Sequence, residues 1–165
     1  MIKLIVAVDE KNCIGYKNHL PWKTKSELKV FNKITQNSVL VFGARTFFSL
    51  PDDFDTSNRE IWVLTYYQPF ELPENKKLRP HRVFFDSGPA TAAILKCDKD
   101  IFICGGRFLY LDYWQITKEV YVSVINGTYK CDTYFEYIDK SQLIPENIIH
   151  QEAEFTTYKY EHIEP

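Results

Sequence analysis

The sequence predicts a single-domain α/β fold, with a central and mostly parallel β-sheet of about eight strands, an antiparallel C-terminal edge and flanking helices. Two patterns along the chain predict this class. Short apolar runs alternate with segments of helical period over the first two thirds, and the last third has strand-like runs with no helical segment between them. At 165 residues, 45% of them hydrophobic, the chain is long enough for one well-buried core and too short for two ordinary ones.

The expected parallel strands are apolar runs rich in β-branched and aromatic residues. They are too short for core helices and suit strands that are buried on both faces; they span 2–8, 39–42, 61–64, 83–85 and 101–104. Residues 26–35 place Leu28, Phe31 and Ile34 on one helical face, and in 89–96 Ala92 and Leu95 share a stripe. Strands that alternate with helices predict βαβ units and hence a parallel sheet.

The C-terminal third predicts a different arrangement. Residues 120–125 and 155–160 are strand-like, and no helical segment separates them. Antiparallel strands can follow one another without a crossover helix, so we expect an antiparallel pair that closes one edge of the sheet.

Charge and hydropathy exclude several classes of partner. Lys and Arg total 20 against 22 Asp and Glu, a net charge of -2, which gives no general attraction to nucleic acid or anionic membranes. No apolar run approaches the roughly 20 residues that span a bilayer, and the N-terminus runs into a strand without a cleavage site. We therefore expect a cytoplasmic protein without nucleic-acid or membrane partners.

The cysteines give no sign of a metal site or a disulfide framework. There is no close CxxC pair and no His at ligand spacing, which argues against zinc. Free Cys tends to be buried, so all of them are expected to be reduced residues of the core or its margin: Cys13, Cys97, Cys104 and Cys131.

Ligands of open α/β sheets gather where the strands end, and the first such junction here has unusual residues. Residues 9–20 form a polar loop with Gly15 that is a candidate lid, followed by Trp22, a broad surface with one N–H donor. Glu27 admits two interpretations. It could complete a capping box with Thr24, or it could project as a desolvated carboxylate of raised pKa that grips an N–H-rich heterocycle or relays a proton.

Two further junctions, 41–46 and 103–110, run from a strand through glycine to an apparent helix start, each with an arginine close by. Two helix N-termini with exposed N–H groups would form a divided cradle for a pyrophosphate. Neither junction matches the GxGxxG fingerprint of ordinary dinucleotide-binding folds.

Taken together and in order, these residues resemble the dihydrofolate reductase family over nearly the whole chain. The residues that carry the resemblance are Ile5-Val6-Ala7-Val8, Ile14-Gly15, Asn18-His19-Leu20-Pro21-Trp22, Glu27-Leu28 with Phe31, Gly43 with Thr46, Arg59, Leu64-Thr65, Cys104-Gly105-Gly106 with Tyr110, and Asp132-Thr133 with Phe135.

The resemblance implies reduction of 7,8-dihydrofolate to tetrahydrofolate, with hydride transfer from NADPH to pterin C6 and protonation at N5. The implied catalytic residues are Glu27, Trp22 and Tyr110. Glu27 would hold the pterin 2-amino group and N3, and Trp22 would position a water that bridges to the substrate. Arg59 would pair with the α-carboxylate of the glutamyl tail. The remaining implied substrate contacts are Ile5, Ala7, Leu28, Phe31, Thr46, Leu50 and Cys104.

The resemblance also implies a cofactor site, with a cis peptide between Gly105 and Gly106 and an adenosine-binding subdomain over about residues 39–98. No metal is implied, and a monomer is expected. The implied contacts are Ala7, Ile14, Gly15, Gly43, Arg45, Thr46, Leu64, Thr65, Tyr66, Gly105, Gly106, Arg107 and Tyr110.

The chain departs from the family pattern at two cofactor positions. Ala44 stands where the family commonly has an arginine that contacts the cofactor 2′-phosphate, with Arg45 one place later, and Tyr66 stands where a small or basic residue is usual. The preference for NADPH over NADH therefore depends on whether Arg45 reaches the phosphate.

Two other functions remain open at this point. One is a reductase of related fold acting on another pterin or a riboflavin precursor, against which Arg59 argues because such substrates lack a glutamyl tail. The other is a non-catalytic folate- or nucleotide-binding module, against which Trp22, Glu27 and Tyr110 argue.

Overall fold

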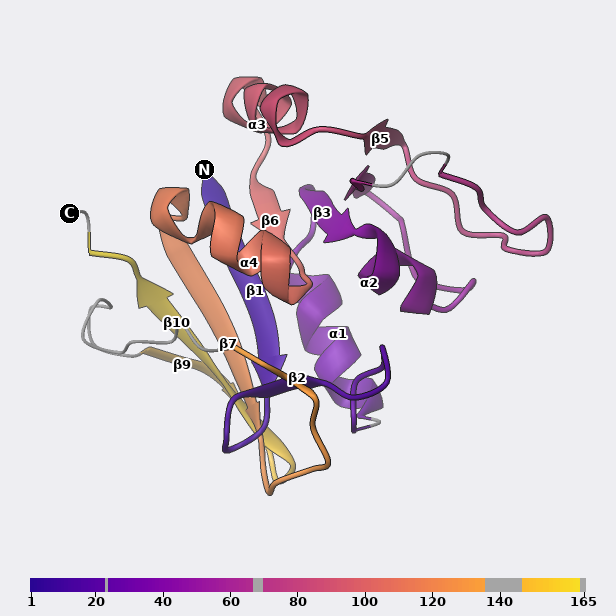
Figure 1. The fold of residues 1–165 in the computed structure, drawn as a ribbon. Helices are drawn as coiled ribbons and strands as arrows, with labels where there is room; N and C mark the ends of the chain where they lie inside the picture. The colour runs from indigo at the N-terminus through magenta and orange to yellow at the C-terminus, as the bar shows by residue number, and fades with distance from the viewer. Residues whose placement is uncertain (23, 67–69, 136–146, 164–165) are drawn as a thin grey trace.

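An eight-stranded sheet runs through the molecule, in the order β5-β4-β3-β6-β1-β7-β10-β9 (Figure 1). The computed structural model describes residues 1–22, 24–66, 70–135 and 147–163. Neighbouring strands from β5 to β7 are parallel, whereas β10 is antiparallel to both β7 and β9. The strands are β1 Ile2–Val8, β3 Val39–Gly43, β4 Glu60–Leu64, β5 Arg82–Phe84, β6 Ile101–Ile103, β7 Glu119–Ile125, β9 Asn147–Gln151 and β10 Phe155–Glu161.

These strands confirm the predicted fold class and the antiparallel C-terminal edge. The helices are α1 Lys25–Ile34, α2 Ala44–Ser49, α3 Ser87–Lys96 and α4 Arg107–Tyr113, the last followed by the 3₁₀ turn η1 Trp114–Ile116. Three short strands have no counterpart in the prediction. They are β9 and the members of a second, two-stranded sheet, β2 Cys13–Gly15 and β8 Thr133–Tyr134.

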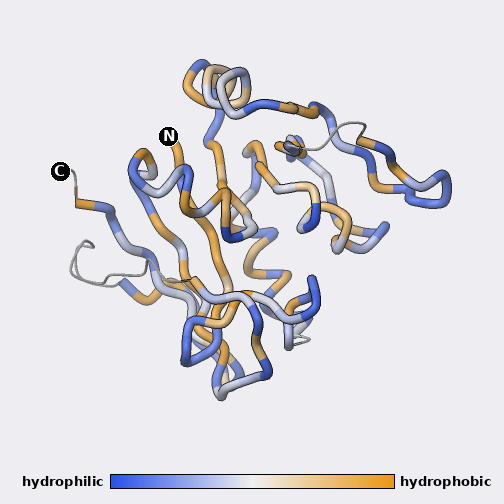
Figure 2. Tube along the Cα trace, viewed as in Figure 1, coloured by the Kyte–Doolittle hydropathy of each residue, from blue (hydrophilic) through white to orange (hydrophobic). Residues whose placement is uncertain are grey.

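The sheet is covered on both faces because its central strands are apolar at successive positions. Val39 and Val41 pack in the cluster that contains residues of α3 and α4, while Leu40 and Phe42 pack with residues of α1 and α2. Figure 2 shows hydrophobic residues along the central strands and hydrophilic ones towards the tip of the excursion between β4 and β5. Within the described ranges, no helix combines the length and apolar character needed to cross a membrane.

The prediction that all cysteines are reduced is wrong for Cys13 and Cys131, which form a disulfide. They are 118 positions apart in the sequence, but the pairing of β2 with β8 brings their Cα atoms to 5.8 Å. That pairing involves too few residues to leave a period in the sequence. Cys97 and Cys104 are free thiols, as predicted.

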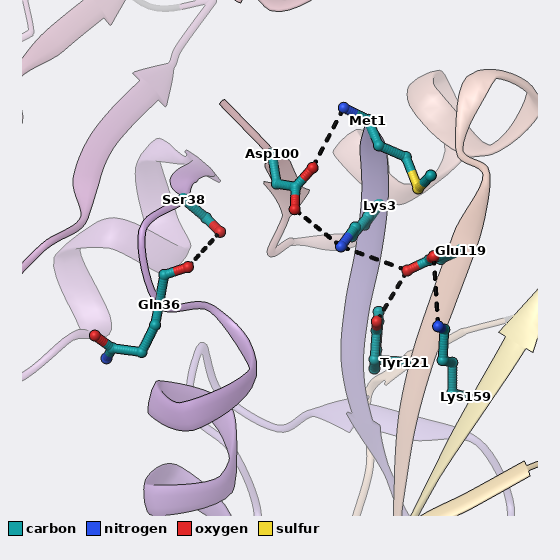
Figure 3. A network of polar contacts seen from close by, with 8 residues as sticks. All are labelled: Met1, Lys3, Gln36, Ser38, Asp100, Glu119, Tyr121 and Lys159. Carbon is teal, nitrogen blue, oxygen red and sulfur yellow. Dashed lines mark hydrogen bonds and ion pairs between the residues drawn. The ribbon is translucent and has the colours of Figure 1, made fainter. Parts of the chain in front are cut away.

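A network of charged groups joins the ends of β1, β6 and β7 (Figure 3). The Lys3 ammonium lies 3.0 Å from an Asp100 carboxylate oxygen and 3.5 Å from one of Glu119. Tyr121 donates a hydrogen bond to Glu119 at 2.9 Å, and Lys159 lies 3.5 Å from the same carboxylate. Burial alone would raise the pKa of Glu119, but the Tyr121 hydrogen bond and the two ammonium groups outweigh it and lower the pKa.

Replacement of Lys3 by Met should lower the free energy of unfolding by about 1–2 kcal/mol at pH 7, because Lys3 and Glu119 are mostly buried. The folded-state pKa values of Asp100 and Glu119 lie below their ordinary values of 3.8 and 4.5. Their contribution is therefore complete above about pH 5 and is lost as the pH falls further. Urea unfolding of both proteins between pH 3 and 7 measures the difference, which should shrink on acidification.

Lys99→Met is the matched control, because Lys99 pairs with Glu60 at 3.3 Å on the surface with both side chains exposed. Its effect should stay within about 0.5 kcal/mol at every pH. Equal losses in the two variants would contradict the role assigned to the Lys3 network.

Candidate active site

The two glycine junctions meet at the carboxyl ends of neighbouring strands β3 and β6. The Gly43 N–H donates to the Gly105 carbonyl at 2.7 Å. A Cβ at Gly43 would lie 3.6 Å from both the Gly105 oxygen and the Gly106 nitrogen, and one at Gly106 would lie 3.2 Å from the Thr46 hydroxyl. The peptide between Gly105 and Gly106 is cis, as the resemblance implies.

Gly105 is the position at which glycine is most strongly required. Its φ is +113°, a conformation that residues with a side chain rarely adopt, and an added Cβ would lie 3.1 Å from the Tyr110 hydroxyl. Tyr110 itself is buried and donates to the Ile5 carbonyl of β1 at 2.9 Å. This side chain therefore joins α4 to β1 behind the two junctions.

Glu27 lies in the first turn of α1 and has the most perturbed carboxylate of the site. Burial raises its pKa from 4.5 to about 7 and is the single cause of the shift. Thr24, at the N-cap of α1, makes no side-chain capping hydrogen bond. The capping-box interpretation is therefore not supported, and the desolvated carboxylate is what the structure contains.

Trp22 lies on the same side of the sheet, packed with Ala7 of β1 and Val30 of α1. Its side chain is buried, and its Nε1–H has no hydrogen-bond partner among the described residues. A buried N–H without a partner costs about 1–3 kcal/mol, which a water or a ligand atom at this point would offset.

The predicted apolar walls are brought together in part. Ile5, Cys104, Phe31 and Leu50 belong to one cluster on the α1 face. Leu28 is exposed to 38% and lies outside that cluster, on the helix that carries Glu27. Burial raises the pKa of the Cys104 thiol, which donates to the Phe102 carbonyl at 3.4 Å, so this residue packs as a small neutral group.

Arg59 is fully buried rather than a surface arginine. It donates to the Asn32 side chain at 2.7 Å, to the Thr35 hydroxyl at 3.1 Å and to the Asp55 carbonyl. Burial lowers its pKa, although the neighbouring Asp55 carboxylate opposes the change. Its Nε–H has no partner among the described residues, and it lines a polar pocket of about 360 Å³ with Asn37, Thr56, Asn58, Glu60 and Lys99.

Several of the remaining predicted cofactor residues lie beside the junctions, and Ile14 and Gly15 lie in a separate small sheet. Leu64 pairs with Gly43 across β4 and β3, so Leu64 and the adjacent buried Thr65 lie beside the first junction. Arg45 is exposed in the first turn of α2, and half-buried Arg107 begins α4. Exposed Tyr66 donates to Asp112 of α4 at 3.1 Å. Ile14 and Gly15 lie in β2.

Sequence reasoning missed two buried polar residues near the site. Ser123 of β7 is the register partner of Ala7, and its hydroxyl lies 2.7 Å from that of Thr157. Asp9 follows β1 and accepts from the backbone N–H groups of Lys11, Cys13 and Tyr129. The sequence did contain a signal for Asp9, because an Asp directly after a strand often accepts hydrogen bonds from nearby backbone N–H groups. Ser123 gave none.

The family model described as dihydrofolate reductase matches residues 1–164. The chain belongs to the dihydrofolate reductase family. It is 32% identical over 161 residues to the dihydrofolate reductase of Mycoplasma genitalium, covering 97% of each chain, and 29% identical over 134 residues to that of Staphylococcus aureus, covering 81% and 77%.

A solved dihydrofolate reductase from Enterococcus faecalis, complexed with NADP(H) and RAB-propyl, shares the fold at a TM-score of 0.79. Its sequence identity is 24%, and the match covers 98% of this chain and 96% of that one. Of the activities that the sequence left open, family membership selects the NADPH-dependent reduction of 7,8-dihydrofolate to tetrahydrofolate. No three His, Cys, Asp or Glu side chains gather into a metal-holding group in the described part of the chain.

Replacement of Glu27 by Gln should change how stability depends on pH. The folded-state pKa of about 7 exceeds the ordinary 4.5, so the folded protein binds the proton more tightly and loses stability as the pH rises between these values. The Gln variant lacks this loss. Its free energy of unfolding, relative to that of the wild type, should therefore rise by roughly 3 kcal/mol between pH 4.5 and 8. Urea unfolding across that range measures it. The exposed Glu154→Gln serves as control, and parallel curves for wild type and Glu27→Gln would contradict the assignment.

Proposed function

We propose that Glu27 binds the pterin ring and controls its protonation in this member of the family. The observation that carries the proposal is the Glu27 carboxylate, whose pKa burial raises to about 7. Glu27 lies one helical turn before the apolar wall residue Phe31. It also follows closely in the sequence after Trp22, whose Nε1–H has no partner among the described residues. In its ionised form the carboxylate accepts hydrogen bonds from the 2-amino group and N3 of a pterin. With a pKa close to neutrality, it also takes up and releases a proton at working pH.

The apolar side chains around Glu27 hold the planar ring and exclude water. Ile5, Phe31, Leu50 and Cys104 already form one cluster, and half-buried Ala7 and exposed Leu28 leave apolar surface for a ligand to cover. The N–H of Trp22 would donate to a water that bridges to the substrate. Such a water completes a proton path that ends at pterin N5.

Arg59 is proposed to bind the α-carboxylate of the glutamyl tail. Its guanidinium is held in a fixed orientation by Asn32 and Thr35, its Nε–H still lacks a partner among the described residues, and a polar pocket adjoins it. Asp55 is exposed to 51%, so its contacts with Arg59 can be given up to an incoming carboxylate. Planar guanidinium groups favour such two-point pairing.

The two glycine junctions fit the cofactor of this family. Gly43, Gly105 and Gly106 leave backbone uncovered where the junctions touch, and the N-caps of α2 and α4 have no side-chain capping bonds, so their first N–H groups stay available to phosphate oxygens. Bound NADPH supplies the hydride. Tyr110 and Thr46 would fix the junctions behind it, and residues 39–98 would form the adenosine-binding subdomain, with Leu64, Thr65, Tyr66 and Arg107 at its margin.

We further propose that the protein acts as a cytoplasmic monomer. All the proposed substrate and cofactor residues come from one chain, so a second copy is not needed to complete the site. The free thiols of Cys97 and Cys104 support this compartment, where thiols are kept reduced and a disulfide such as Cys13–Cys131 would be transient. Light scattering of the purified protein and cell fractionation test the two statements.

Glu27→Gln should lower the turnover number for dihydrofolate by at least about 10²-fold, because a group placed for proton transfer contributes on that scale. The wild-type rate should fall as the pH rises above about 7, where Glu27 loses its proton, and the variant should lack this step. Thr24→Val, at a residue that makes no capping bond, is the control and should keep wild-type turnover. Turnover of Glu27→Gln within about threefold of wild type would exclude Glu27 from the proton path.

Arg45→Ala should raise the KM for NADPH by about tenfold and leave the KM for NADH unchanged, since a charged contact to phosphate is worth about 1.5 kcal/mol or more. Since Ala44 replaces the arginine usual at this turn, the exposed guanidinium of Arg45 is the one available there to contact the 2′-phosphate. Initial rates with both nucleotides measure the effect. Arg79→Ala removes the same charge from an exposed loop position and should change neither constant; an equal effect of both variants would show general electrostatics instead.

A further inference from the structure

The segment after β1 is fastened to the segment after β7 at several points. The disulfide between Cys13 and Cys131 is the covalent one. Around it, Asp132 donates its backbone N–H to the Gly15 carbonyl at 3.1 Å, and Lys17 donates its backbone N–H to the Asp132 carboxylate at 2.9 Å. The disulfide thus lies within the contact between residues 12–17, which we term the lid, and residues 129–135, which we term the strap.

A second attachment lies at the base of the lid. The buried Asp9 carboxylate accepts from the N–H groups of Cys13 at 2.9 Å and Tyr129 at 3.0 Å, and so bonds lid and strap at once. The Glu10 N–H donates to the Gly127 carbonyl at 3.1 Å. These bonds do not involve sulfur, so reduction of the disulfide does not break them directly.

Ile14 and Gly15, the lid residues that the family resemblance implies as cofactor contacts, directly follow Cys13 in β2. We propose that Cys13 and Cys131 form a thiol–disulfide pair that positions the lid for cofactor binding, so that reduction loosens the lid and weakens the protein's hold on NADPH. This inference rests on the proposed cofactor site. Preordering a contact segment before binding strengthens binding because less conformational freedom is lost in the complex.

The environment of the sulfur atoms suits a bond that an external thiol can open. Cys13 is fully buried, while Cys131 is half-buried, so an external thiolate reaches the Cys131 sulfur first. A dithiol reductant attacks there, the S–S bond breaks, and a second thiol resolves the mixed disulfide. The reductant thereby gives two electrons and two protons, leaving it as a disulfide and Cys13 and Cys131 as thiols.

In the disulfide-bonded structure, carbonyl oxygens lie close to both sulfur atoms and are acceptors for the thiols that reduction would produce. The Cys13 and Cys131 sulfur atoms lie 3.6 and 3.4 Å from the Gly15 carbonyl, and that of Cys131 lies 3.0 Å from the Thr133 carbonyl. Reduction therefore exchanges a covalent bond for weak S–H donors, within a fold that Asp9 still holds together. In reducing compartments the disulfides that do occur are mostly transient or redox-sensing, which fits this role.

The test compares the purified full-length protein after oxidation and after treatment with dithiothreitol. Thiol titration in denaturant should count two free thiols in the oxidised protein, Cys97 and Cys104, and four in the reduced one. Stopped-flow release of NADPH should be at least about threefold faster from the reduced protein, with a correspondingly higher Kd.

Two variants identify the cysteines responsible. Cys131→Ser should behave as the reduced protein in both conditions, and Cys97→Ser, remote at the end of α3, should respond to dithiothreitol as the wild type does. Asp9 keeps lid and strap bonded in Cys131→Ser, and its circular dichroism spectrum checks that it folds.

The outcomes separate this inference from the proposed function, because turnover of dihydrofolate is recorded on the same samples. Four thiols in the oxidised protein, or the same NADPH release rate in both states, would overturn the lid inference while normal turnover leaves the reductase in place. Redox-dependent NADPH release without any turnover would support the lid inference and refute the proposed catalytic roles.

Discussion

The arrangement of the site depends on one backbone hydrogen bond, from the Gly43 N–H to the Gly105 carbonyl. It can form because β3 and β6 are neighbours in the sheet although a helix, two strands and another helix separate them in the chain. β3 ends at Gly43, and Gly105 and Gly106 follow β6 shortly after its last residue, Ile103, so two backbones approach where side chains would hold them apart. With that contact made, α4 begins at a fixed place, and Tyr110 reaches across to the Ile5 carbonyl.

The site is also where the fold gives up stability. Glu27 is a carboxylate in surroundings that favour its neutral form, the Nε1–H of Trp22 is buried without a partner among the described residues, and buried Arg59 retains an unsatisfied Nε–H. Each departs from the rule that buried polar groups are paired, whereas the Lys3 network at the amino ends of β1 and β7 obeys it. Departures of this kind at residues predicted to contact the substrate indicate groups that a bound ligand would satisfy.

Much of this could be predicted from the sequence, because strands buried on both faces leave unbroken apolar runs and close backbone contacts require glycine. The runs at 39–42 and 101–104 and the Gly105-Gly106 pair fall where the structure places β3, β6 and the second junction. The fate of Glu27 could not be settled from spacing, since a capping box and a buried carboxylate need the same residues at the same positions. Ser123 was missed for a similar reason: a lone serine in an apolar strand gives no pattern.

The largest error was the prediction that Cys13 and Cys131 are reduced, and this error has a physical cause. A strand of three residues against one of two leaves no hydrophobic period, and so small a sheet is not stable by itself. It exists because other interactions hold its strands together: the Asp9 carboxylate at one end, the Asp132 contacts with Gly15 and Lys17 at the other, and the disulfide between them. A lid held in this way has no packed core of its own to keep it in place. Its position should therefore respond to the loss of an attachment, and the disulfide is the covalent attachment among these, which a reductant removes without changing the sequence.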